Sequence, residues 1–236
     1  MKSILVFLFF GFPCIIFTQN IADLDGKFPG SETTIQQEDV NSLFNAKVQT
    51  NFTQGDGFPV SHDYGFFTPK MGVITVDLDT DDDLEIVYGS ANYLYAKNMD
   101  GTDVAGWPVQ VSDPIVWAPS VGDIDGDGSE DIIVAAGTTN PNGSIYAFYL
   151  NGQIKPGFPF TDAGISPMMP ILGDIDNDGD DEIIYSKRVS SSEGYMSVLN
   201  GDGTVHTGWP YAMGEYPGSA AAVGDIDNDG TVEIVG

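Results

Sequence analysis

Positive charge is scarce in this sequence. Its 236 residues include 8 Lys and Arg against 35 Asp and Glu, so the formal net charge at pH 7 is −27. A polyanion of this size repels phosphate backbones, and we therefore expect no nucleic acid partner. Hydrophobic residues nevertheless make up 42% of the chain and aromatic residues 11%. That is enough apolar material for a packed core, which argues against a solvated acidic tail.

Cysteine is almost absent, since Cys14 is the only one and lies in an apolar N-terminal run. Lys2 precedes this run, which extends from Ile4 to Phe17, is short for a membrane span and ends in polar residues. The pattern predicts a signal peptide over residues 1–18, with an uncleaved anchor as the alternative. We expect a secreted or cell-surface chain, without membrane insertion after signal removal. An exported domain without disulfides needs another source of rigidity, for which metal is the candidate.

Sustained helical periodicity is missing after the signal, and an internal repeat takes its place. Three markers recur with a period of 51 residues. The string Gly-Asp-Ile-Asp begins at Gly122, Gly173 and Gly224; Gly-Trp-Pro or Gly-Phe-Pro begins at Gly106, Gly157 and Gly208; and a turn dipeptide lies at Asp100-Gly101, Asn151-Gly152 and Asp202-Gly203. An earlier copy, shortened in one connection, begins at Asp77.

Each unit is expected to contain four short strands. In one unit these are Pro119–Ile124, Asp131–Ala136, Ser144–Leu150 and Gln153–Phe160, with Asn151-Gly152 predicted as a two-residue type I′ turn. The two middle strands are apolar at consecutive positions, whereas a sheet with one wet face would alternate. Four-stranded sheets covered on both faces by equal neighbours are typical of an all-β β-propeller. A sandwich of hairpins is the alternative, and it predicts alternation without a strict period.

A nine-residue acidic loop occurs four times, with acids at positions one, three, five and nine. The sets are Asp77, Asp79, Asp81 and Glu85; Asp123, Asp125, Asp127 and Asp131; Asp174, Asp176, Asp178 and Glu182; and Asp225, Asp227, Asp229 and Glu233. Position six holds Asp82, Gly128, Gly179 and Gly230, and position seven holds Asp83, Ser129, Asp180 and Thr231. Glycine at position six permits the positive φ that curls such a loop.

The chemistry of this loop favours calcium. Alternate carboxylates converge on one point, the carbonyl of position seven turns inward, and the acid at position nine closes the shell. All-oxygen coordination of this kind suits Ca²⁺, whereas Mg²⁺ needs a smaller octahedral shell and softer metals prefer His or Cys. An EF-hand is excluded, because it needs Glu at position twelve, where the copies have Tyr88, Val134, Tyr185 and Gly236. Acidic turns without metal are the remaining alternative.

These copies resemble the FG-GAP or VCBS repeats of integrin-α-type propellers and their bacterial relatives. The resemblance covers residues from about 55 to 236. It implies a propeller of seven or eight blades with calcium in the first hairpin of each blade, and a partner on the opposite face. Residues 19–54 are expected to be an N-terminal segment, partly linker, that could supply closing strands. The last unit stops after its second strand, so we expect the chain to be a fragment of a larger ring, with a closed four-bladed ring as the alternative.

No catalytic constellation is apparent in the sequence. His62 and His206 are expected to be ordinary loop residues, and the repeated Trp107, Phe158 and Trp209 to be structural wedges. The favoured function is a non-enzymatic adhesion or interaction module that binds a protein or glycan on the face away from calcium. Trp117 and Tyr216 lie there as packing or contact residues. The alternatives are a polysaccharide lyase, whose first candidate residues are Lys187 and Arg188, and an accessory propeller of a secreted hydrolase.

Overall fold

The computed structural model describes residues 72–137, 143–162, 166–190, 192–214 and 220–236. The predicted signal peptide, the segment 19–54, His62 and Tyr216 lie outside these residues. All regular elements in the described ranges are strands, so the all-β prediction is confirmed. Within the same ranges, no helix has the length and apolar character needed to cross a bilayer.

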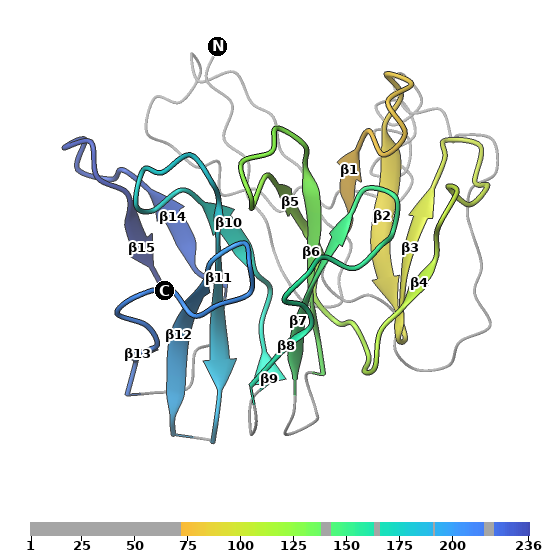
Figure 1. Cartoon of the computed structure of the whole chain (residues 1–236). Coiled ribbons are helices and arrows are strands. Elements are labelled where there is room, and N and C mark those ends of the chain that lie inside the picture. Colours follow the sequence, from red (N-terminus) through yellow and green to blue (C-terminus); the bar gives the residue numbers. More distant parts are fainter. Residues whose placement is uncertain (1–71, 138–142, 163–165, 191, 215–219) are drawn as a thin grey trace, which may run out of the picture. The chain divides into compact units, whose positions relative to one another are not determined.

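The strands form antiparallel sheets that follow chain order (Figure 1). The first sheet contains β1 (Ile74–Val76), β2 (Glu85–Ser90), β3 (Tyr93–Lys97) and β4 (Val109–Gln110). The second contains β5 (Ser120–Gly122), β6 (Asp131–Ala136), β7 (Ser144–Tyr149) and β8 (Phe160–Thr161). The third contains β10 (Ile171–Gly173), β11 (Glu182–Arg188), β12 (Gly194–Leu199) and β13 (Tyr211–Ala212), with β9 (Ser166–Pro167) beside β11. A fourth pair consists of β14 (Ala222–Gly224) and β15 (Glu233–Val235).

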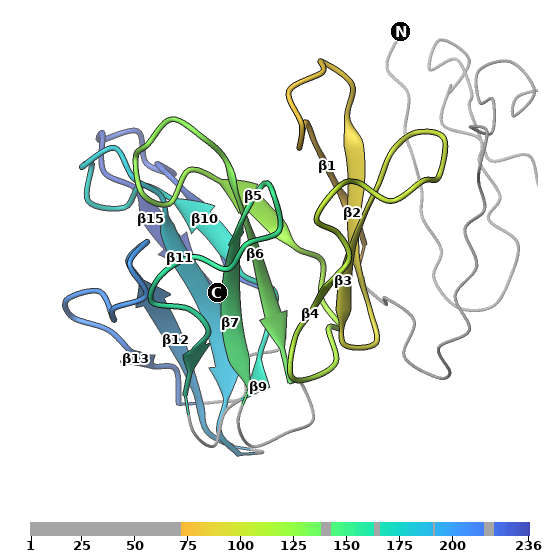
Figure 2. The same ribbon diagram turned by 45° about the vertical axis from the view of Figure 1, so that its right-hand side comes forward.

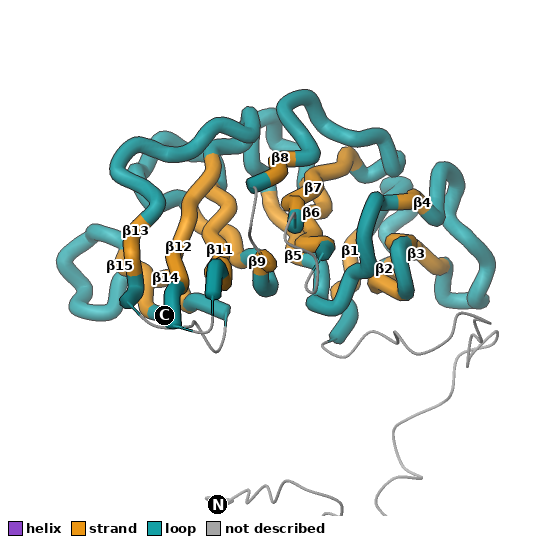
Figure 3. Tube along the Cα trace, turned by 90° about the horizontal axis from the view of Figure 1, so that it is seen from below, coloured by secondary structure: helices purple, strands orange, loops and turns teal. Residues whose placement is uncertain are grey.

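Neighbouring sheets stand side by side with their first strands in contact. β1 contacts β5, β5 contacts β10, and β10 contacts β14, an arrangement that Figure 3 shows along the strands. The sheets are the blades of a propeller-like structure. The hairpins that join the first two strands of each blade lie together at one end, and the ends of β2, β6 and β11 lie at the other (Figures 1 and 2).

The second strands of the second and third blades explain the continuous apolar runs. In β6, Ile132 and Val134 pack into a cluster with the first blade, whereas Ile133 packs into a cluster with the third. In β11, Ile183 faces the second blade and Ile184 faces the fourth. Since successive side chains point to opposite faces of a strand, the central part of a strand between two neighbours is apolar at consecutive positions. This confirms the prediction that both faces are covered.

Two predictions about the end of each blade were wrong in detail. The fourth strand of the second blade is not continuous over 153–160, because only the bridge Phe148–Ile154 and the short β8 pair with β7. The turn before it is not type I′. The Gly152 N–H donates to the Tyr149 carbonyl at 2.9 Å, and Gly152 alone of the dipeptide has positive φ, 80°. Gly152 is thus the fourth residue of the turn over 149–152, where it takes the left-handed conformation of a bulge residue.

The two remaining sequence markers meet at one junction between blades. Gly157, which has φ 87°, packs against the backbone of Asp202 and Gly203 in the next blade, and Gly106 packs in the same way against Asn151. Beside this contact, Trp107 donates its indole N–H to the Leu150 carbonyl at 3.0 Å and packs edge-on against Phe148. The wedge prediction is therefore confirmed for Trp107, and Phe158 is also buried.

The junction predicts a difference between two equivalent glycines. A Cβ at Gly157 would clash with the Asp202 carbonyl oxygen, whereas in the described residues nothing lies within 4 Å of a Cβ at Gly208. Both have positive φ, 87° and 96°, so alanine costs about 1 kcal/mol of backbone strain at each. G157A should lose a further 1–3 kcal/mol or so from overpacking. Urea unfolding of both variants measures this, and equal losses would contradict the junction.

Candidate metal centres

The acidic loops have two left-handed residues each. Position six has positive φ in all four copies, as predicted: 72° at Asp82, 84° at Gly128, 100° at Gly179 and 91° at Gly230. Position four is also left-handed, which the sequence analysis missed. It holds Thr80, Gly126, Asn177 and Asn228, with φ between 61° and 65°. Gly and Asn tolerate this conformation best, and their presence in three copies was the available signal.

Two carboxylates in each loop fix the backbone around them. The first acid accepts a hydrogen bond from the N–H of position six, at 2.8–3.3 Å over the four copies. The acid at position five accepts a hydrogen bond from the N–H of position seven, at 2.8–3.0 Å. In the third loop these bonds run from Gly179 to Asp174 and from Asp180 to Asp178. The loop is thus curled by its own carboxylates, with position-one and position-five acids held on its inside.

Three carboxylates converge in every loop. In the second, third and fourth loops the acids at positions one, three and five each offer an oxygen, and these atoms lie within 4.8 Å of one another. In the first loop the group is Asp77, Asp79 and Glu85. An oxygen set of this kind could hold a hard divalent cation. The predicted carbonyl ligand at position seven stays a prediction.

The acid at position nine lies beneath the loop at the start of the second strand. Its carboxylate accepts a hydrogen bond from the N–H of position two, at 2.7 Å for Glu85, 3.0 Å for Glu182 and 2.9 Å for Glu233. Burial raises the pKa of Glu85 and of Glu182. The role of the position-nine acid in closing a metal shell stays a prediction. A buried carboxylate under the loop nevertheless favours a neighbouring cation.

Lys155 supplies such a cation in the second blade. Its ammonium lies 2.7 Å from an Asp125 oxygen and 2.5 Å from an Asp131 oxygen, and it stands over the Tyr149 ring at 4.7 Å from the centroid. Burial lowers the pKa of Lys155, but its hydrogen bonds to the two carboxylates more than compensate and raise it. The acids at positions three and nine are thus already paired in this loop.

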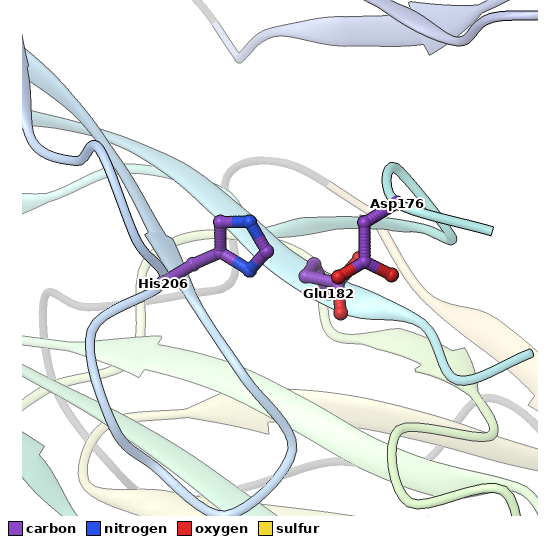
Figure 4. A group of neighbouring side chains, drawn as sticks. All are labelled: Asp176, Glu182 and His206. Carbon is purple, nitrogen blue, oxygen red and sulfur yellow. The ribbon is translucent and has the colours of Figure 1, made fainter. Parts of the chain in front are cut away.

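His206 occupies the corresponding place in the third blade, one repeat of 51 residues after Lys155. Figure 4 shows its imidazole facing Asp176 and Glu182, and the three ligand atoms lie within 4.8 Å of one another. His206 lies outside the strands, as expected for a loop residue, and its side chain in addition faces two carboxylates. In the first blade the same position is Val104, which is buried.

The residues named for the lyase and partner alternatives have structural partners. Lys187 is buried, forms an ion pair with Asp162 and lies over the Tyr195 ring. Arg188 is exposed and donates from Nε to the Ser190 carbonyl at 3.3 Å. Trp117 packs against the cluster between the second and third blades, as its packing interpretation predicted.

The fold and loops define a class: an all-β repeat protein of propeller-like blades with one acidic loop per blade. A family model described as FG-GAP-like repeat matches residues 123–185 and 174–236. The chain is an FG-GAP repeat protein over this part of its length.

Two solved structures are similar to the chain. The V. cholerae biofilm matrix protein Bap1 has a TM-score of 0.45 and 20% identity over 69% of this chain and 27% of Bap1. BBS1N in complex with ARL6DN has a TM-score of 0.46 and 18% identity over 67% of this chain and 48% of that chain. The chain thus spans less than half the length of either. No curated protein was found to match it.

The Lys155 pair generates a prediction about stability. Lys155 and Asp131 are both 2% exposed, so K155M leaves a buried carboxylate unpaired and should lower the free energy of unfolding in chelator by about 3 kcal/mol. K97M is the matched control. Lys97 pairs with Asp103 at 2.6 Å, but that carboxylate is 48% exposed, and the loss should be below about 1 kcal/mol. Equal losses would argue against a special role for Lys155.

Proposed function

We propose that this protein is a calcium-dependent recognition module, exported to the cell surface or beyond. The observation that carries the proposal is the convergence of three carboxylates in each of four loops. Contacts between loops add to it. The Asp181 N–H donates to the Asp123 carbonyl at 2.9 Å, and the pKa of Asp180 is raised by desolvation and by the carboxylates around it, including Asp178 and Asp123. Bound Ca²⁺ relieves this repulsion.

Calcium should therefore stabilise the folded chain. Sites of extracellular modules have Kd values of roughly 10⁻⁴–10⁻³ M. A ligand at a hundred times its Kd adds about 2.7 kcal/mol per site by mass action. Melting curves with about 10 mM Ca²⁺, a hundred times the lower of these Kd values, and with chelator should separate clearly, with Mg²⁺ giving a smaller shift. Superimposed Ca²⁺ and chelator curves would refute calcium binding.

The first loop should bind calcium more weakly than the three loops that have glycine at position six. Asp82 adopts φ 72°, where the other copies use glycine, and a non-glycine residue there carries a strain of about 1 kcal/mol. D82G removes both the strain and a charge, whereas D82N removes the charge alone. By calorimetry, D82G should tighten the weakest site about fivefold relative to D82N. If the two variants titrate alike, strain at this residue does not limit binding.

The recognition role is supported by how the repeat uses its residues. Repeated positions serve the acidic loops, the blade faces and the glycine junctions, which any blade requires. Lys187, the leading base of the lyase alternative, is buried in an ion pair with Asp162. Specific binding then falls to the non-repeated connections at the end away from the loops, where a protein or a glycan is the proposed partner.

This role predicts binding without turnover. The calcium-loaded protein should retain a protein or glycan from a defined panel on a resin, release it in chelator, and leave it chemically unchanged. Mass spectrometry and absorbance for unsaturated sugar ends monitor the products. Any calcium-dependent cleavage of the bound partner would overturn the non-enzymatic role. If unsaturated sugar ends form and also persist with the K187M variant, the catalytic group is a residue other than Lys187.

A further inference from the structure

His206 brings a nitrogen donor to an otherwise all-oxygen loop. Asp176, Glu182 and His206 come from the loop, from the start of β11 and from the segment after β12, and their ligand atoms lie within 4.8 Å of one another (Figure 4). Glu182 is buried, His206 is half-buried and Asp176 is exposed. Imidazole is a preferred ligand of zinc and related transition ions. A loop whose ligands are all oxygen atoms does not favour these ions over calcium.

A chain of hydrogen bonds fixes the tautomer of His206. The Thr204 hydroxyl donates to an Asp202 oxygen at 2.6 Å, so it must accept the bond of 2.9 Å from the Asn200 amide nitrogen. The Asn200 amide oxygen is then the atom that lies 2.8 Å from Nδ1 of His206, and Nδ1 must donate to it. In the neutral ring the lone pair is consequently on Nε2. A His ligand that donates its other N–H to an oxygen is the usual arrangement in metal sites.

The second blade shows independently that a cation belongs at this place. Lys155, which corresponds to His206 in the repeat, puts its ammonium 2.7 Å and 2.5 Å from Asp125 and Asp131, the acids at positions three and nine. Their counterparts in the third blade are Asp176 and Glu182, and a neutral imidazole leaves them without that positive charge. The third blade keeps the carboxylate pair and replaces the built-in cation by a potential metal ligand.

We propose that Asp176, Glu182 and His206 bind a divalent transition ion, with zinc as the representative, at a site that overlaps the predicted calcium set of the same loop and adds His206 to it. A pocket of about 420 Å³ lined by Asp176, Asn200 and His206, among others, leaves room for water or a ligand group to complete the coordination. Asp176 also belongs to the group with Asp174 and Asp178, so its carboxylate is shared between the two sites. The proposal does not depend on whether the loops bind calcium.

Zinc titration of the whole chain tests this site. In calcium-free buffer, where Ca²⁺ cannot compete for the shared carboxylates, calorimetry should show one zinc equivalent that binds more tightly than the acidic surface does. H206Q should weaken this equivalent at least about a hundredfold, and N200A about 10–100-fold. H62Q changes the only other histidine and should leave it intact. Equal zinc isotherms for wild type and H206Q would overturn the proposal.

The first blade allows a gain of function by one substitution. It already has Asp79, Glu85, Asn98, Asp100 and Thr102 at the positions of Asp176, Glu182, Asn200, Asp202 and Thr204. Asn98 donates to Thr102 at 2.9 Å, and Thr102 donates to Asp100 at 2.6 Å, as in the third blade.

V104H should therefore add a second zinc equivalent, and V104Q should add none. A folded V104H protein with unchanged zinc stoichiometry would contradict the claim that this arrangement makes the site. The proposed calcium function is tested separately by the melting temperature of H206Q. Calcium should still raise this temperature, whether or not the variant binds zinc.

Discussion

Burial of both faces of the inner strands is the constraint on which the rest of this structure depends. A strand such as β6 has one row of side chains in the cluster with the first blade and the other row in the cluster with the third. Such strands have no wet face, so polar and charged groups must collect at the strand ends. The acidic loops at one end follow from this segregation. They gather like charges closely, and the fold accommodates them by hydrogen bonds from the loop backbone and, in the second blade, by the Lys155 ammonium.

The blades differ in the residue that faces the carboxylates at positions three and nine. The second blade uses the ammonium of Lys155 from its own chain. The third presents His206, which can share a metal with the acids, and the first presents the apolar Val104. These three residues occupy one position of the repeat. The blades therefore share a backbone but differ in charge at the point where the loop meets the strand, so a uniform set of identical metal sites is not expected.

Local patterns were enough to predict the loops and the layering. Acids at alternate positions and a glycine at position six specify the curled backbone within a few residues, and the apolar runs specify strands covered on both sides. The Asn151-Gly152 dipeptide did not reveal whether glycine lies at the centre of the turn or at its last position, since both geometries use positive φ. The environment of His206 depends on pairing across the sheet, which short motifs do not record. Comparing residues one period apart, Lys155 with His206, would have indicated it.

The junction between blades has a consequence for how such a chain changes over evolutionary time. At Gly106 and Gly157 the contact with the next blade is made largely with main-chain atoms. A main-chain contact is indifferent to which side chains surround it, provided that the glycine persists. Duplication of one complete 51-residue unit therefore carries a compatible joint at each border. Copies can then diverge in their loops and metal ligands without coordinated changes in their neighbours, and the number of units is free to vary among descendants.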